Sequence, residues 1–217
     1  MGKQAFALIE FLVVVSIVAI LVGMLLPALS TAREKAKAMK CVANLKQLEQ
    51  VSAFYTDDND GNFPSKIVNA FFYPYAFVTL GYLPYKQGAK NTIYLCPSDL
   101  TPGSNAGMYF SYGNNVHSYS DSTSVHLGAI TYKPFAKPSK LTQTSSMMHF
   151  ADSYNAVDKL SCVTIYGYST TVIYLDSSRH LGKVSLSYVD GHAGMVKFPL
   201  VGFNTDFEFW FGKKDPR

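Results

Sequence analysis

The sequence carries few charges and lacks the short motifs of the common enzyme classes. Charged residues make up only 16% of its 217 positions and the formal net charge is +4, which gives no reason to expect a nucleic-acid partner. It contains no nucleophile elbow, phosphate-binding loop or HExxH sequence. It has only three cysteines. They form no CxxC pair and no His–Cys spacing that would predict a zinc site. We therefore expect neither enzymatic activity nor a cofactor.

A long apolar run near the N-terminus is the strongest feature present. Residues 6–29 contain a single charged residue, Glu10. As one α-helix the run would be about 36 Å long, enough to cross a hydrocarbon core of about 30 Å. Gly23 and Pro27 interrupt it and predict a local loosening of the helix. An ionisable residue inside a membrane span costs about 2.5–3.5 kcal/mol near the middle and less near an end, so Glu10 is expected to be functional.

Residues 6–14, Phe-Ala-Leu-Ile-Glu-Phe-Leu-Val-Val, resemble the N-terminal signature of type IV pilins and type II secretion pseudopilins. The resemblance implies that prepilin peptidase removes a leader, residues 1–5, by cutting between Ala5 and Phe6, and that Phe6 is then N-methylated. It also implies that Glu10 pairs with the terminal amine of a neighbouring subunit in a filament. Such a buried pair offsets two desolvation costs together. Ala5 departs from the family, which usually has Gly before the cut.

The same resemblance implies where the protein resides and what it contacts. It would be a single-pass inner-membrane protein whose C-terminal domain is periplasmic or extracellular. Its partners would be prepilin peptidase, copies of itself or related pilins, an inner-membrane assembly platform and membrane lipid. The alternative is an anchored domain that does not polymerise and that binds carbohydrate or protein through exposed tyrosines and Trp210.

Residues 30–56 predict an amphipathic continuation of the helix, and residues 57–217 predict one globular domain. The apolar stripe recurs every three or four positions: Ala32, Ala36, Met39, Val42, Leu45, Leu48, Val51 and Phe54 or Tyr55. Charged residues would occupy the opposite face: Arg33, Glu34, Lys37, Lys40, Lys46 and Glu49. Together with the resemblance, this predicts an α+β fold, the pilin-like lollipop, in which a long helix packs on a C-terminal antiparallel sheet.

The globular part predicts a short helix and several strands. The helix is expected near residues 70–80. Strands are expected around 108–112, 146–151, 162–168, 171–175, 184–188 and 193–198. Between the last two strands, Asp190 and Gly191 are typical of a two-residue hairpin turn.

Two further patterns extend the resemblance. Outside the cytoplasm cysteines usually form disulfides, so three cysteines would form one disulfide and leave one free thiol. Cys41, Cys96 and Cys162 allow three such pairings. Pilin-like proteins of one subfamily carry a cysteine before Asn-Leu-Lys-Gln and another in Cys-Pro-Ser, as Cys41 and Cys96 stand here, which implies the disulfide Cys41–Cys96. His180, nine further residues and then Asp190-Gly191 resemble the His-X9-Asp-Gly signature of the same prepilin-like proteins.

Two groups of residues suggest chemistry. Asp57, Asp58 and Asp60 are weak calcium candidates, although the EF-hand spacing fails and a solvated loop ending the helix explains them more simply. Five histidines invite a metal or acid–base role: His117, His126, His149, His180 and His192. His180, His192 and Asp190 would have to meet across the hairpin, as in an anchored hydrolase. A structural role for these residues is the favoured interpretation.

Overall fold

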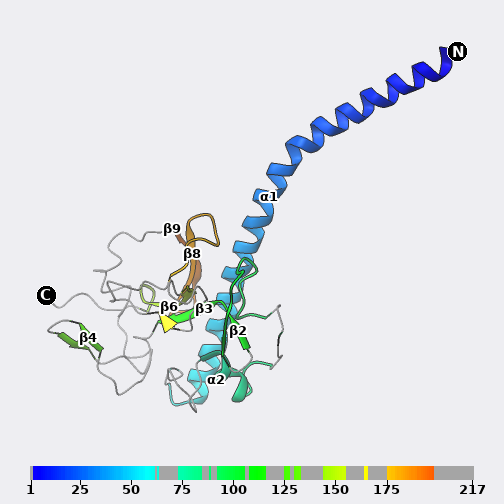
Figure 1. The fold of residues 1–217 in the computed structure, drawn as a ribbon. Coiled ribbons are helices and arrows are strands. Elements are labelled where there is room, and N and C mark those ends of the chain that lie inside the picture. Colours follow the sequence, from blue (N-terminus) through cyan, green and yellow to red (C-terminus); the bar gives the residue numbers. More distant parts are fainter. Residues whose placement is uncertain are drawn as a thin grey trace. The chain divides into compact units, whose positions relative to one another are not determined.

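The structure is a computed structural model (Figure 1). It describes residues 2–61, 63, 73–84, 88, 92–105, 108–115, 125–127, 130–132, 144–154, 164–165 and 175–197. For residues 2–7, 74–76, 105, 125–127, 130–132 and 164–165 only the backbone is described. The chain divides into two compact units, residues 1–37 and residues 38–217. Predictions for His117, Cys162 and Trp210 lie outside the described residues, as does most of the strand expected at 171–175.

The first unit is formed by helix α1, which runs from Gly2 to Asp58 and continues into the second unit. The helix passes through Gly23 and Pro27 without a break. Proline removes one backbone hydrogen bond and costs about 3 kcal/mol in a helix interior. Because the long helix keeps its backbone hydrogen bonds before and after Pro27, the cost of this proline does not terminate the helix.

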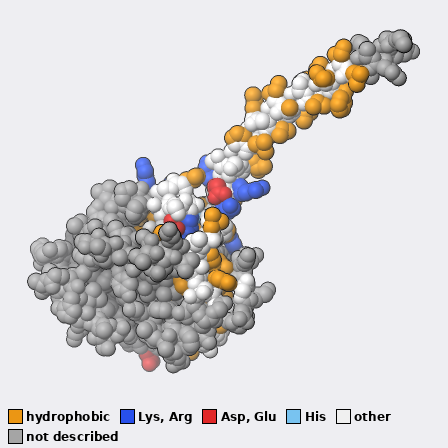
Figure 2. Space-filling model, viewed as in Figure 1, with side chains coloured by type: hydrophobic (Ala, Val, Ile, Leu, Met, Phe, Trp, Pro, Cys, Tyr) orange, Lys and Arg blue, Asp and Glu red, His pale blue; other side chains and the backbone are white. Residues whose placement is uncertain are grey.

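Apolar side chains surround the first unit. Figure 2 shows hydrophobic side chains along the visible face of this helix. The large exposed hydrophobic residues are Leu8, Ile9, Phe11, Leu12, Val13, Val14, Val15, Ile17, Val18, Ile20, Leu21, Val22, Met24, Leu25, Leu26 and Leu29. By length and composition α1 is able to cross a membrane, although an N-terminal signal sequence would satisfy the same test.

In the second unit, the end of α1 contributes one face to a core. Leu45, Leu48 and Tyr55 are buried there, as the periodicity predicted, and they belong to the same cluster as Phe77 and Phe150. The core also contains Cys41, Val51, Tyr73, Leu83, Tyr94, Leu95, Cys96, Met108 and Tyr112.

Several residues of α1 were assigned to the wrong face. Ala32, Ala36 and Met39, expected on the buried stripe, are exposed, and of the alternatives Phe54 and Tyr55 it is Tyr55 that is buried. Glu49, expected on the solvated face, is only 5% exposed. The buried face follows a different register, along Cys41, Leu45, Leu48, Ser52 and Tyr55. Glu49, beside this face, is tolerated in the interior because His149 and Ser187 of the sheet supply its partners.

The sheet of the second unit has five strands in the order β7-β3-β6-β8-β9. Its strands are β3 (Tyr112–Asn115), β6 (Met148–Asp152), β7 (Thr164–Ile165), β8 (Lys183–Tyr188) and β9 (Ala193–Lys197). All neighbours are antiparallel except β3 and β7, which are parallel. With the long helix this makes the fold α+β, as predicted, although one pair departs from the expected antiparallel sheet.

The remaining elements are a short helix and two small ribbons. Helix α2 covers Tyr73–Thr79, inside the range predicted for it. Strands β1 (Gly103–Asn105) and β2 (Met108–Phe110) pair with each other, as do β4 (Val125–Leu127) and β5 (Ile130–Tyr132).

The β8–β9 hairpin lies where the alternation predicted it, but its turn is one residue longer. The Tyr188 N–H donates to the His192 carbonyl (2.9 Å), which leaves Val189, Asp190 and Gly191 in the loop. Gly191 has a φ of 91°. The predicted two-residue turn is therefore wrong: a three-residue hairpin loop places a left-handed residue at its last position, and glycine adopts that conformation without strain.

Candidate functional site

The predicted processing site lies at the beginning of α1. Ala5, Phe6 and Glu10 all belong to this helix, and the Glu10 side chain is exposed. Phe6 and Glu10 are four residues apart, so they share one face of the helix, separated by about 6 Å along its axis. This places the carboxylate one helical turn from the amino group that cleavage before Phe6 would create.

A buried cluster of polar groups joins α1 to the sheet in the second unit. The Glu49 carboxylate, on α1, accepts a hydrogen bond from the Ser187 hydroxyl of β8 (2.6 Å). Its other oxygen lies 2.8 Å from Nδ1 of His149, on β6. The His149 ring is packed against Phe150 and Phe63, with centroids 4.1 and 4.9 Å away. Three elements are thus held together by one carboxylate.

This cluster contains the residue types of a serine hydrolase but not their arrangement. A nucleophilic serine must donate its proton to a histidine that a carboxylate orients. Here Ser187 donates to Glu49 instead, and Nε2 of His149 is buried without a hydrogen-bond partner among the described residues. The group therefore fastens the helix to the sheet and does not form a nucleophile.

A second buried polar cluster surrounds Arg179, which is 9% exposed. Its Nε lies 2.6 Å from an oxygen of Asp176, and its Nη2 lies 3.2 Å from Asp99. The guanidinium also donates to the carbonyls of Ser111 (3.1 Å) and Ser153 (2.7 Å). Because Arg179 presents five donors in a fixed plane, it holds several chain segments at once.

His180 points to the disulfide. Its Nε2 lies 3.3 Å from Sγ of Cys96 and 3.3 Å from a carboxylate oxygen of Asp152. Cys96 is joined to Cys41 of α1, with Cα atoms 5.3 Å apart, which is the pairing that the resemblance implied. The histidine of the His-X9-Asp-Gly pattern therefore packs inside the domain, next to the bond that ties the helix to the loop before β1.

The other end of that pattern is on the surface. Asp190 accepts a hydrogen bond from the His192 N–H (3.1 Å) and contacts its Nδ1, and the His192 ring stacks on Tyr188 (centroids 4.0 Å apart). The described contacts of His180 are with Asp152 and Cys96 and include neither Asp190 nor His192. The hypothetical site of His180, Asp190 and His192 is not assembled, because the two histidines lie in different surroundings, one buried and one exposed.

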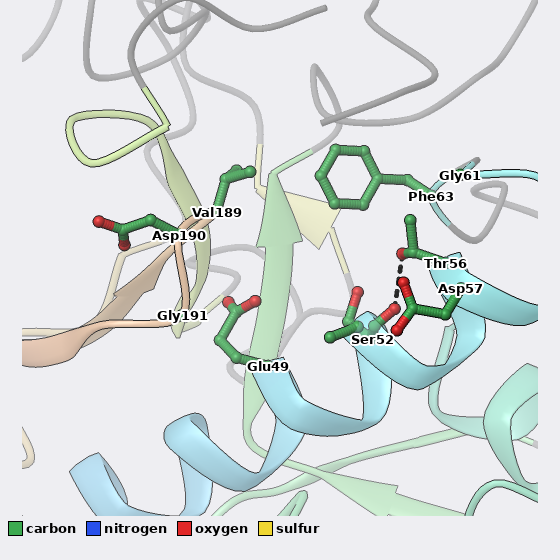
Figure 3. A pocket seen from close by; sticks show the side chains of 10 residues that line it. Glu49, Ser52, Thr56, Asp57, Gly61, Phe63, Val189, Asp190 and Gly191 are labelled. Carbon is green, nitrogen blue, oxygen red and sulfur yellow. Dashed lines mark hydrogen bonds between the residues drawn. The ribbon is translucent and has the colours of Figure 1, made fainter. Parts of the chain in front are cut away.

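A pocket of about 340 Å³ lies between the end of α1 and the β8–β9 turn, inside the second unit. Figure 3 shows Glu49, Ser52 and Thr56 of α1 on one side, while the Asp190 carboxylate points away from Glu49. Thr56 closes its own helical turn by donating to the Ser52 carbonyl (2.6 Å). The pocket is also lined by Ala53, Asp57, Gly61, Phe63, Val189 and Gly191.

The three calcium candidates do not converge. Asp57 lines the pocket, whereas Asp58 accepts a hydrogen bond from the Tyr82 hydroxyl (3.0 Å). Asp60 adopts a φ of 55° in the turn that ends the helix. Within the described part of the chain, these aspartates do not form a group close enough to share one metal ion. The loop that ends the helix therefore remains the simpler explanation.

Burial strongly perturbs two tyrosines of the core. It raises the pKa of Tyr73 well above the ordinary value, and the Tyr73 hydroxyl donates to the Tyr112 carbonyl (2.6 Å). Burial also raises the pKa of Tyr112, reinforced by the negative charge of Asp152. Both phenols therefore stay protonated at physiological pH and act as hydrogen-bonding core residues.

Sequence reasoning missed Glu49, His149, Ser187, Arg179, Asp99, Asp152 and Asp176 as members of polar clusters. One signal was available for Glu49, which is four residues from Leu45 and so lies beside the buried stripe. Asp176 and Arg179 pair at a separation of three residues, so their spacing was a local signal too. The remaining residues carry no local signal, because their partners are distant in sequence.

No protein-family model, curated protein or solved structure matches the chain. Its function must therefore be argued from its own residues and their geometry.

Proposed function

We propose that this chain is a structural subunit of a filament of the type IV pilus or type II secretion pseudopilus kind. Prepilin peptidase cuts between Ala5 and Phe6, Phe6 is N-methylated, and the subunit waits in the inner membrane with its C-terminal domain outside. Assembly then packs the N-terminal helices of many copies, with Glu10 facing the terminal amine of a neighbour.

The observation that carries this proposal is an exposed apolar helix surface with one carboxylate near its start. Full burial of each Leu, Ile, Val, Phe or Met side chain contributes about 1.5–3 kcal/mol. The described residues of the chain do not cover residues 8–29, so lipid or other helices must do so. Within such an environment Glu10 requires a positive partner, and a terminal amine one turn further along a neighbouring helix supplies it.

The second unit fits the role of a rigid domain carried by this helix. Its buried polar groups connect separate segments: Glu49 joins α1 to the sheet, and Arg179 joins four loops and strand ends. A disulfide fixes α1 to the same domain through Cys41 and Cys96. A subunit that transmits load along a filament benefits from such cross-connections.

The first test is the N-terminal residue of the protein isolated from its native cells, measured by intact mass and terminal-peptide mass spectrometry. The proposal expects a chain beginning at N-methylated Phe6. A chain that still begins Met-Gly-Lys-Gln-Ala would show that Ala5 blocks the cut, and the filament role would then be abandoned.

The second test separates assembly from membrane insertion. Glu10→Ala should remain in the membrane but form no filaments, because the terminal amine of the neighbour loses its counter-charge. Ser16→Ala is the matched control: Ser16 lies on the same exposed apolar helix, and its hydroxyl donates to the Val13 carbonyl of that helix (2.7 Å). Normal filaments of Glu10→Ala in electron micrographs would refute the role given to Glu10.

A second candidate is the anchored binding domain that does not polymerise. A hollow of about 510 Å³ favours it, within the range of ligand pockets and lined in part by Pro97, Leu100 and Tyr109. Leu100 is 93% exposed. Retention of carbohydrate or peptide by the full chain, lost in Tyr109→Ala, together with an uncleaved N-terminus, would establish this candidate instead.

A further inference from the structure

Two sulfur atoms and one imidazole meet at a single buried point of the second unit. Cys41 comes from α1, Cys96 from the loop before β1 and His180 from the turn before β8. One donor atom of each lies within 4.8 Å of the donor atoms of the other two, and all three residues are buried. Within the described part of the chain, this is the group of His, Cys and acidic residues whose spacing suits a metal ion.

In the structure the two sulfur atoms are bonded to each other, and two distances around Nε2 of His180 are those of neighbouring ligands in a tetrahedral zinc site. Zn–S bonds of about 2.3 Å and Zn–N or Zn–O bonds of about 2.0–2.1 Å place neighbouring ligand atoms roughly 3.3–3.8 Å apart. The distance from Nε2 of His180 to Sγ of Cys96 is 3.3 Å. The same nitrogen lies 3.3 Å from an oxygen of Asp152. Asp152 lies outside the three-residue group, so its carboxylate has to move toward the sulfur atoms to act as a fourth donor.

We propose that the reduced chain binds one Zn²⁺ through the thiolates of Cys41 and Cys96 and Nε2 of His180, with Asp152 as the fourth ligand. The zinc site and the disulfide are then two alternative states of the same residues. Zinc holds α1 to the loop before β1 until the cysteines are oxidised. This site lies apart from the proposed assembly helix and stands whether or not the chain polymerises.

An external disulfide as oxidant and a dithiol as reductant are sufficient to convert the zinc-bound state and the disulfide state into each other. Two thiols bind Zn²⁺ as thiolates and release two protons. An external disulfide then accepts two electrons and two protons and becomes two thiols, while the S–S bond between Cys41 and Cys96 forms and Zn²⁺ leaves. A dithiol reductant reverses the reaction and is itself oxidised to a disulfide.

The surrounding charges suit both states. A disulfide and a zinc ion bound by two thiolates are each neutral, so the exchange leaves the net charge of the buried cluster unchanged. The Asp152 carboxylate is held by the Ser185 N–H (2.7 Å) and lies 3.8 Å from Arg179. Such outer contacts orient ligands in metal sites. The metal therefore requires no additional buried charge.

The test uses the full chain in detergent micelles, reduced with a phosphine under nitrogen, mixed with zinc chloride and desalted. Mass spectrometry of the metal content should find about one zinc per reduced chain and none in the oxidised chain. With Co²⁺ in place of zinc, the reduced chain should show a thiolate-to-metal charge-transfer band and the visible bands of a tetrahedral site. An octahedral cobalt spectrum would overturn the proposal.

Variants assign the ligands. His180→Asn, which keeps a polar side chain of similar size, should weaken zinc binding at least about ten-fold, since even outer-contact losses reach that size. His192→Asn, on the exposed hairpin, and Cys162→Ser should bind zinc as the native chain does. The proposal fails if the reduced native chain holds no more zinc than the double variant Cys41→Ser/Cys96→Ser, or if His180→Asn equals the native chain.

One measurement remains decisive if His180→Asn does not fold. X-ray absorption of the zinc-loaded native chain should find two sulfur atoms at about 2.3 Å and two lighter atoms at about 2.0–2.1 Å. A shell with only light atoms, or with more than two sulfur atoms, would overturn the assignment.

Discussion

Two carboxylates of the same helix show how differently the two units of this chain are built. In the first unit, Glu34 lies 2.8 Å from Lys37, and both side chains are about one third exposed. In the second unit, Glu49 lies at the same 2.8 Å from His149, and both are buried. The first unit exposes apolar side chains and leaves its ion pair partly accessible to water, whereas the second encloses its polar groups. Equal distances therefore predict unequal contributions to stability.

The largest loss of stability is expected when the buried guanidinium of Arg179 is removed from the second unit. Arg179→Ala removes the guanidinium that neutralises the buried carboxylates of Asp99 and Asp176. Removing one member of a buried ionic cluster costs about 3–5 kcal/mol. Denaturant unfolding of the full chain in detergent, followed by near-ultraviolet circular dichroism, measures it. Lys183→Ala, at the exposed start of β8, serves as the control. A loss below about 1 kcal/mol, the range of surface ion pairs, would contradict the structural role of this cluster.

The next effect concerns the connection between helix and sheet. Glu49→Ala should lower the free energy of unfolding by about 1.5–3 kcal/mol, because His149 and Ser187 lose a charged acceptor. A double-mutant cycle with His149→Phe should give a coupling of about 0.5–3 kcal/mol, as for residues in contact. Strictly additive losses would mean that the two side chains do not interact in solution.

A smaller effect comes from the buried tyrosines. Tyr73→Phe should cost about 0.5–1.5 kcal/mol at neutral pH, because the Tyr112 carbonyl loses its donor. The raised pKa values of Tyr73 and Tyr112 add a pH dependence. Below about pH 10 the folded and unfolded chains both keep these protons. Above it the unfolded chain loses protons that the folded chain retains, so stability falls as pH rises.

The slope of the free energy of unfolding against pH, above about pH 10, tests this prediction. Each tyrosine that stays protonated only in the folded state lowers the free energy of unfolding by about 1.4 kcal/mol per pH unit above pH 10. Tyr73→Phe should remove one such contribution between pH 10 and pH 11.5. Equal slopes in the native chain and the variant would show that Tyr73 titrates normally.

The smallest effect belongs to the first unit. Glu34→Ala removes a partly exposed pair three residues apart on a helix, and it should change the free energy of unfolding by no more than about 0.2–0.5 kcal/mol. Its effect should also vanish in high salt, since exposed charges are screened. A loss comparable to that of Glu49→Ala would remove the contrast between the two units.

Part of the fold could be predicted because it is encoded locally. Alternation of apolar and polar residues placed β8 and β9, and a seven-residue helix was found inside the predicted 70–80 range. The turn between β8 and β9 was wrong by one residue. Both turn types accept an Asp-Gly sequence, and the choice between them depends on the register with which the strands pair, fixed here by Ser187 opposite Ala193.

The buried polar clusters could not be predicted in this way. Glu49 was placed on the solvated face of α1 because its charge alone indicates exposure. Its burial depends on His149 and Ser187, which are 100 and 138 residues away in sequence. His180 was expected in a structural role, but nothing near it in sequence indicated that it would contact Cys96.

The sequence by itself determined the long helix, its apolar surface, the isolated carboxylate Glu10 and the alternating strands of the hairpin. These follow from backbone hydrogen bonding and side-chain periodicity over a few neighbouring residues. Only the tertiary structure decided that Cys41, Cys96 and His180 meet, and that Arg179 and Glu49 are buried. Such contacts depend on the pairing of distant segments, and a buried charge is tolerated only where that pairing brings its partners to it.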